Sequence, residues 1–186
     1  MVNPDRRYQR TPRSQRQSYL ALVREADQQR CAYGHAGLGD LAISEGKPEA
    51  PVRHLRRALD LAPQESRYHY LLGFAYGQLE RWQEAERFLQ KAVELEPGSA
   101  EYLRCLGWAL CNSGKVQQGR ELLEKARMME PRNPYILSDL ATSCLTSGEF
   151  DLARRYAIEA RSLAPDDPLI ESLVLVIERV APEEGW

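Results

Sequence analysis

The 186-residue chain has little that would indicate secretion, a membrane or a highly charged polymer as partner. Its formal net charge is only −2, so no strong overall field attracts nucleic acid or an anionic membrane. No apolar run approaches the roughly 18 residues that a membrane-spanning helix needs. The first twenty residues contain several arginines but no apolar core, which argues against a signal peptide. We therefore expect a cytoplasmic protein with no membrane insertion and no nucleic-acid partner.

The chain is also poor in cysteine, and none of its four cysteines lies in a C-x-x-C motif. So few cysteines in a chain of this length do not indicate a disulfide scaffold, and reduced thiols are expected. Cys31 and His35 stand four residues apart, so both could bind one metal ion from one helix face. Two further ligands would be needed, and the local spacing supplies none. Ordinary packing is therefore favoured, and we expect no metal and no cofactor.

A catalytic constellation is absent as well. The stretch GHAGLGD, from Gly34 to Asp40, departs from the G-x-G-x-x-G pattern of a phosphate-binding loop, and no strand precedes it. Glutamate and arginine are abundant, but they stand at helical spacing on solvated faces, with no sign of paired acids in a pocket. The sequence therefore predicts that the chain is not an enzyme.

What the sequence does contain is a repeat with a period of 34 residues, marked most clearly by proline. Each proline follows the end of an amphipathic helical pattern. The in-phase prolines are Pro63, Pro97, Pro131 and Pro165. Midway through each unit the aligned residues are Gly46, Glu80, Gly114 and Gly148. A glycine there can end a first helix in the left-handed conformation, and the proline cannot continue the second helix. Each unit is thus a pair of helices, which must stack on its neighbours to bury its apolar face.

This pattern resembles the tetratricopeptide repeat (TPR) family. The residues that carry the resemblance best are Leu72, Gly73, Tyr76, Ala85, Leu89, Ala92 and Pro97, then Leu106, Gly107, Leu110, Leu123, Ala126 and Pro131, then Leu140, Ala141, Ala153, Ala160 and Pro165. The resemblance implies an all-α fold, a right-handed superhelical array of TPR helix-turn-helix repeats. Gly119 and Pro51 stand where the family has an alanine in the second helix, so we expect local loosening at both positions.

The period also predicts how the chain is organised. Clear repeats are expected at 66–99, 100–133 and 134–167, after a degenerate repeat at 32–65. A leading helix at 14–30 and a capping helix at 168–181 complete a single TPR domain over residues 14–181. A disordered basic N-terminus at 1–13 and a tail at 182–186 are expected to flank this domain.

The apolar arc of the final helix permits two interpretations. The helix is either a solvating cap for the last repeat or a contact surface for a second copy of the chain. Leu175 stands outside the apolar arc, which favours the second interpretation.

Each first helix also carries a second stripe of side chains, about 120–130° around the helix from the stripe that the core needs. The resemblance implies that this stripe lines a concave groove for an extended or helical peptide. The predicted groove residues are Arg67, Tyr70, Leu71, Phe74, Gln78, Arg104, Cys105, Trp108, Asn112, Tyr135 and Asp139. The stripe also contains Glu101, Ser138, Thr142 and Thr146, and in the first repeat Tyr33, Ala36, Gly37, Asp40 and Ser44. Tyrosine, tryptophan and arginine are enriched at binding hot spots. The alternative is that Phe74 and Trp108 bury against the leading helix or against each other.

The leading hypothesis is a non-enzymatic protein–protein interaction module, an adaptor or assembly scaffold that binds a peptide or helix of a partner protein. One alternative is a secretion-type TPR chaperone for a membrane-inserting client. Another is a self-assembling scaffold, a homo-oligomer formed through the C-terminal or leading helix. Some TPR domains clamp a C-terminal carboxylate with basic and amide side chains, but this stripe has aromatic and acidic residues at those places. The sequence leaves open whether the leading helix occupies the groove.

Overall fold

The computed structural model describes residues 12–46 and 49–181, and every regular element in those ranges is an α-helix. The helices are α1 (Pro12–Leu22), α2 (Gln28–Ser44), α3 (Ala50–Leu61), α4 (Ser66–Gln78), α5 (Trp82–Leu95), α6 (Ala100–Asn112), α7 (Val116–Met129), α8 (Pro134–Thr146), α9 (Phe150–Leu163) and α10 (Pro168–Val180). The predicted all-α fold is confirmed. Within the described ranges, no helix is both long enough and apolar enough to cross a bilayer.

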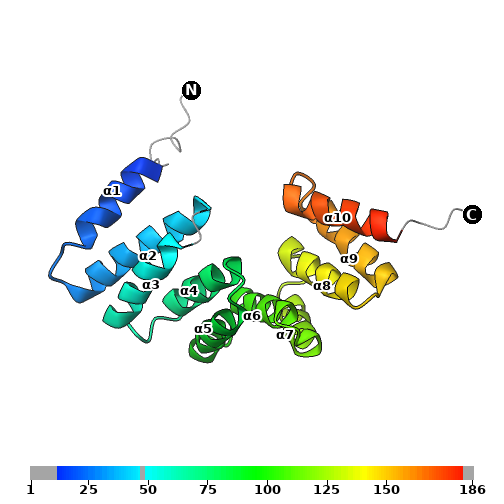
Figure 1. Cartoon of the computed structure of the whole chain (residues 1–186), viewed down its shortest axis with the longest axis horizontal. Coiled ribbons are helices and arrows are strands. Elements are labelled where there is room, and N and C mark those ends of the chain that lie inside the picture. The colour runs from blue at the N-terminus through cyan, green and yellow to red at the C-terminus, as the bar shows by residue number, and fades with distance from the viewer. Residues whose placement is uncertain (1–11, 47–48, 182–186) are drawn as a thin grey trace, which may run out of the picture. The chain divides into compact units, whose positions relative to one another are not determined.

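The chain divides into two compact units, Met1–Leu95 and Glu96–Trp186. In the first unit α2 packs on α3 and α4 packs on α5, and α1 lies against α2 (Figure 1). In the second unit α6 packs on α7 and α8 packs on α9, and α10 lies against α9 and α8. Each pair is one repeat, made of a first helix and a second helix.

The turn inside each repeat adopts the left-handed backbone that the glycine pattern predicts. The φ angle is +66° at Gly46, +88° at Gly114 and +75° at Gly148. Glu80 occupies the same place in its repeat and also has a positive φ, +56°. Because this conformation costs a residue with a Cβ roughly 1–3 kcal/mol, the turn geometry prevails over the local preference of Glu80.

The second helix of each repeat ends two residues before the in-phase proline. These last helical residues are Leu61, Leu95, Met129 and Leu163. Proline lacks the backbone N–H that would extend the helix, and it disfavours helical backbone in the residue before it. The proline pattern therefore predicts where the second helices stop.

Small residues bring the two helices of a repeat together. A Cβ added to Gly73 would lie 2.6 Å from Leu89 Cγ, and one added to Gly107 would lie 2.8 Å from the Gly119 carbonyl oxygen. A Cβ added to Gly119 would meet Cys111 Sγ and the Gly107 carbonyl oxygen. The loosening expected at Gly119 is therefore wrong, because α6 and α7 approach so closely there that an alanine would not fit.

The leading helix is shorter than the sequence suggested. Instead of a helix over 14–30, α1 ends at Leu22 and α2 begins at Gln28. Asp27 causes the break: it has extended backbone, and its carboxylate accepts a hydrogen bond from Arg30 N at 2.8 Å. That bond satisfies an otherwise unpaired N–H of the new helix, which is the usual role of aspartate at this position. The tails expected at 1–13 and 182–186 lie outside the described residues, apart from Pro12 and Arg13 in α1.

Candidate binding face

The predicted groove residues are distributed over both units. Arg67, Tyr70, Leu71, Phe74 and Gln78 belong to α4 of the first unit. The others belong to α6 and α8 of the second unit. A single groove that contains Phe74 and Trp108 together stays a prediction, and each unit is described by itself.

On α4 the stripe is partly closed by contacts within the chain. Tyr70 and Phe74 are half-buried, and their rings stack with centroids 6.3 Å apart. Arg67 forms an ion pair with Asp40 of α2 at 3.0 Å, and both side chains stay largely exposed. Leu71 is buried, so its side chain supports the helix packing and does not line an open surface.

The leading helix covers part of the same stripe on α2. Tyr19 of α1 lies edge-on to Tyr33 with ring centroids 6.0 Å apart, and a Cβ added to Gly37 would meet the Tyr19 ring. Arg16 of α1 also forms a 2.6 Å ion pair with Glu45 just after α2. Within the first unit, α1 therefore occupies the first-repeat section of the predicted stripe.

In the second unit an ion network links α6 to α8. Arg104 donates hydrogen bonds to both carboxylate oxygens of Glu101, at 2.8 and 2.7 Å, and to Asp139 Oδ2 at 2.7 Å. The Arg104 and Asp139 side chains are only 14% and 17% exposed. Burial raises the pKa of Asp139 to about 6, although Arg104 opposes the shift. Cys105 is fully buried beside this network, so its thiol is not part of an open surface.

A small pocket of about 30 Å³ lies between α6 and α8. It is lined by Trp108, Cys111, Asn112, Asp139, Thr142, Ser143 and Thr146. Trp108 is half-buried at this pocket, and Asn112 is partly exposed. Three of the predicted groove residues thus meet at one place. Ser143 is a lining residue that the sequence reasoning missed, because it lies one position beyond the stripe residue Thr142.

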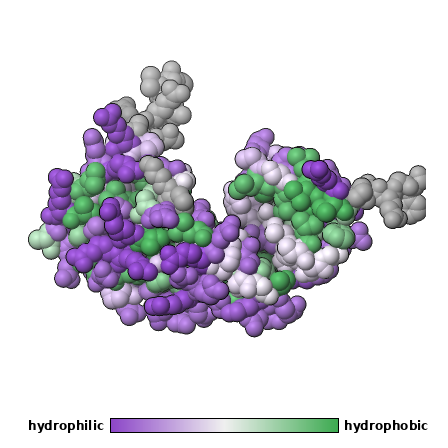
Figure 2. Space-filling model, viewed as in Figure 1, coloured by the Kyte–Doolittle hydropathy of each residue, from purple (hydrophilic) through white to green (hydrophobic). Residues whose placement is uncertain are grey.

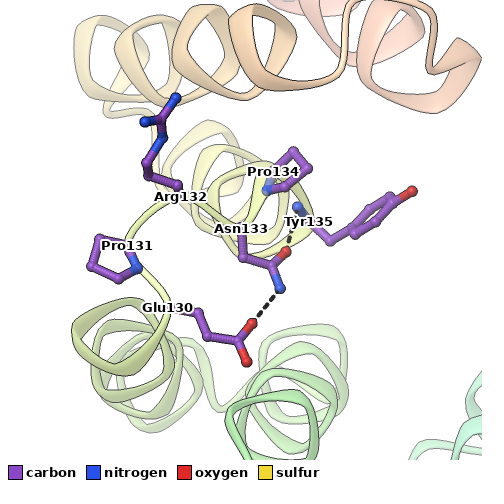
Figure 3. Close-up of a pocket in the computed structure, with 6 residues that line it drawn as sticks. All are labelled: Glu130, Pro131, Arg132, Asn133, Pro134 and Tyr135. Carbon is purple, nitrogen blue, oxygen red and sulfur yellow. Dashed lines mark hydrogen bonds between the residues drawn. The ribbon is translucent and has the colours of Figure 1, made fainter.

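Tyr135 lies apart from that pocket, in the first turn of α8. The turn between α7 and α8 borders an open hollow of about 650 Å³, lined by residues 130–135 (Figure 3). Asn133 donates to Glu130 Oε2 at 2.7 Å and accepts from Tyr135 N at 3.0 Å. Figure 3 shows Tyr135 and Arg132 pointing away from each other, so the hollow has no convergent set of polar groups.

The final helix extends the stripe with apolar residues. Moving 34 residues on from α8 gives Leu169, Ser172, Leu173, Val176 and Val180 on α10. Leu169 is 76% exposed, Val176 50% and Val180 57%. Figure 2 shows hydrophobic side chains gathered over the part of the second unit where Figure 1 draws α9 and α10. Because α8 contacts both α6 and α10, the stripe runs over three neighbouring helices of this unit.

Serial helix pairs that share a side-chain stripe on their first helices define an α-helical repeat protein. Models of the tetratricopeptide repeat match residues 66–99 and 112–175, which together make up more than half of the chain. The chain belongs to the tetratricopeptide repeat family. No curated protein sequence matches it.

Solved structures of TPR proteins share the fold. TTC0263 from Thermus thermophilus superposes with a TM-score of 0.74 at 19% identity, covering 89% of this chain and 90% of that one. YrrB, described as a TPR protein with an unusual peptide-binding site, gives 0.65 at 18% identity, with 84% and 80% covered. MamA gives 0.65 at 22% identity, with 80% and 85% covered.

Proposed function

We propose that the chain is a protein-interaction module whose second unit binds an amphipathic segment of a partner protein. The bound segment would lie along the stripe on α6, α8 and α10. TPR repeats bind protein or peptide partners, and a peptide-binding site is described for the structural relative YrrB. An adaptor or assembly role follows from this proposal, and no step of it requires catalysis.

The observation that carries the proposal is the exposed apolar row on α10. Leu169, Val176 and Val180 are exposed apolar side chains at the groove positions of α10, whose neighbouring face, with Ile170, Val174 and Ile177, is in the core. Exposing such side chains has a free-energy cost of roughly 25 cal/mol per Å² of apolar surface, which a bound apolar segment would recover. Exposed apolar rows beside polar groups commonly mark interaction sites.

The chemistry of the stripe also restricts the bound segment. It is apolar on α10 and polar on α6 and α8, where Glu101, Arg104 and Asp139 carry a formal net charge of −1 with both acids ionised. The segment that fits best has apolar side chains at one end and polar or basic side chains at the other. Such a segment binds either as a helix or in extended form.

The test uses peptides selected from a random library against the full chain. Val176→Asp should weaken binding of the selected peptides at least tenfold in calorimetry, because it places a charge in the apolar row. Leu175→Asp is the matched control, since Leu175 is 56% exposed on the same helix but lies off the stripe. Equal effects of the two substitutions, or none, would contradict the proposal.

Self-association through α10 is a second candidate, favoured by the same exposed side chains and by Leu175 beside them. It predicts a concentration-dependent dimer in light scattering that both Val176→Asp and Leu175→Asp disrupt. A monomer at the highest soluble concentration would exclude it.

A further inference from the structure

Several side chains around the pocket between α6 and α8 can accept hydrogen bonds. Thr142 Oγ1 donates to the Ser138 carbonyl oxygen at 3.0 Å, and Thr146 Oγ1 donates to the Ser143 carbonyl oxygen at 2.9 Å. Asn112 Nδ2 donates to the Trp108 carbonyl oxygen at 2.8 Å. Each of these side chains donates a hydrogen bond to a backbone carbonyl oxygen. Its own oxygen atom therefore still has lone pairs that can accept a hydrogen bond in the pocket.

Two further groups add to this acceptor character. Asp139 uses Oδ2 for Arg104, and an ionised carboxylate has acceptor sites beyond that bond. Ser143 is 1% exposed, and the Cys111 thiol is the one hydrogen-bonding group that its Oγ meets among the described residues. This thiol is at most a weak partner. A buried hydroxyl without a strong hydrogen bond has a free-energy cost, so a group that bonds to Ser143 Oγ would be stabilised there.

The size of the pocket limits what can enter it. A volume of about 30 Å³ suits one group about as large as a water molecule. A methylated amine, a guanidinium group or a carboxylate is larger, and a carboxylate would also face Asp139. A primary ammonium group is small, donates three hydrogen bonds and accepts none, so it matches a lining rich in acceptors.

Charge and the aromatic wall favour the same group. Burial makes the Asp139 carboxylate costly to ionise in spite of Arg104, so a second cation close to it would lower that cost. The Trp108 ring at the wall of the pocket can attract a cation through its π face.

We propose that this pocket receives the ammonium group of a lysine side chain from the segment bound on the second unit. The identification of the pocket as a lysine subsite rests on the proposed function. Asp139 and Ser143 would bond to the ammonium group, and Trp108 would cover the alkyl chain that leads out toward α10.

The pocket can be tested without any peptide. n-Butylammonium chloride is titrated at pH 7.5 into the ¹⁵N-labelled full chain, and the indole N–H resonance of Trp108, assigned with Trp108→Phe, is followed by NMR. We expect a saturable shift with a dissociation constant in the millimolar range. n-Butanol, which has the same chain without the charge, should bind at least tenfold more weakly.

Two variants locate the ammonium group. Ser143→Ala removes a hydroxyl whose partner is at most the weak Cys111 thiol, so it should nearly preserve the melting temperature and weaken n-butylammonium binding three- to tenfold. Asp139→Asn should weaken it at least tenfold, and circular dichroism checks that the helices remain. Equal binding of n-butanol, or unchanged binding by Ser143→Ala in a folded protein, would overturn the proposal.

The outcome separates this inference from the proposed function. Saturable ammonium binding together with an inert Val176→Asp substitution would show that the pocket is correct and the apolar row is not a binding surface. No ammonium binding, with selected peptides still dependent on Val176, would overturn the lysine subsite alone.

Discussion

Both units carry the stripe of side chains on their first helices, but the contacts of these side chains differ between the units. In the first unit part of the stripe contacts the chain itself: α1 lies against α2, and the rings of Tyr70 and Phe74 stack on each other. In the second unit Arg104 joins α6 to α8, and α10 leaves apolar side chains exposed. One repeat architecture therefore supports both a surface partly covered by a helix of its own unit and a surface with exposed apolar side chains.

The sharpest contrast between the units is in their arginines. Arg104→Ala removes the partner of Asp139 and should destabilise the protein by about 3 kcal/mol, because a poorly solvated carboxylate loses its counter-charge. Arg67→Ala is the matched variant and should cost less than about 1 kcal/mol, since the Arg67–Asp40 pair is solvated. Urea unfolding followed by circular dichroism measures both. Equal losses would mean that the two units do not differ in this respect.

The packing of α1 on α2 depends on the close approach of the two helices at Gly34. A Cβ there would lie 2.7 Å from Leu22 Cβ and 3.0 Å from the Tyr19 carbonyl oxygen, so Gly34→Leu should displace α1 and cost about 2 kcal/mol. Gly37→Ala is the milder comparison, because the three atoms nearest to its added Cβ all belong to the ring of Tyr19, a side chain that can rotate. Hydrogen exchange of the α1 amides reports the displacement. Unchanged protection of α1 in Gly34→Leu would show that the contact is not needed.

The two units should also respond to pH in opposite directions. His35 and His54 of the first unit face each other, with their Nδ1 atoms 3.1 Å apart. Burial lowers the pKa of both, and nearby arginines, Arg57 and Arg53 for His35 and Arg53 and Arg16 for His54, lower it further. Their contribution to stability is complete above pH about 6.5 and is lost as the pH falls through the lowered values.

Asp139 of the second unit has the opposite sign. Its pKa is raised from 3.8 to about 6, so between these values the folded state holds a proton that the unfolded state lacks. Its contribution to stability therefore falls as the pH rises through this window. Lowering the pH from 7.5 to 5 should reduce the free energy of local unfolding of α2 and α3, compared with that of α6 and α8, by an amount on the order of 1 kcal/mol. Hydrogen exchange, corrected for intrinsic rates, measures this difference. As controls, His54→Gln should remove the pH dependence of the first unit, and Asp139→Asn should remove that of the second.

The smallest effect concerns a turn that lacks its glycine. Glu80→Gly should stabilise the first unit by about 0.5–1 kcal/mol, because it relieves the strain of the positive φ at a modest entropic cost. Gly114→Ala, in the corresponding turn of the second unit, should destabilise by a similar or larger amount. Thermal unfolding measures both changes, with a higher melting temperature expected for Glu80→Gly and a lower one for Gly114→Ala. A loss of stability in Glu80→Gly would contradict the backbone strain inferred at Glu80.

Much of the fold was predictable because the 34-residue period repeats every local signal. The period predicts a turn at Glu80, by alignment with its glycine counterparts, and the helix ends before each proline, while the left-handed backbone of Glu80 itself comes from the structure. Aspartate is a common residue just before a helix, so Asp27 could have indicated the break after Leu22. The apolar stripe before it indicated one continuous helix instead. The ion pair of Arg104 and Asp139 joins residues 35 apart on two helices, so it depends on packing that no local pattern contains.

Leu175 has a consequence for how long such an array can grow. It occupies the position of Gly73, Gly107 and Ala141, where the first helix of a repeat normally admits its second helix. With a leucine there, and Glu178 and Arg179 nearby, a further second helix could not seat against α10 at the usual distance. Adding repeats beyond α10 by design would therefore begin with Leu175→Gly. Leu175 therefore distinguishes α10 from the first helices α4, α6 and α8, each of which has glycine or alanine at this position.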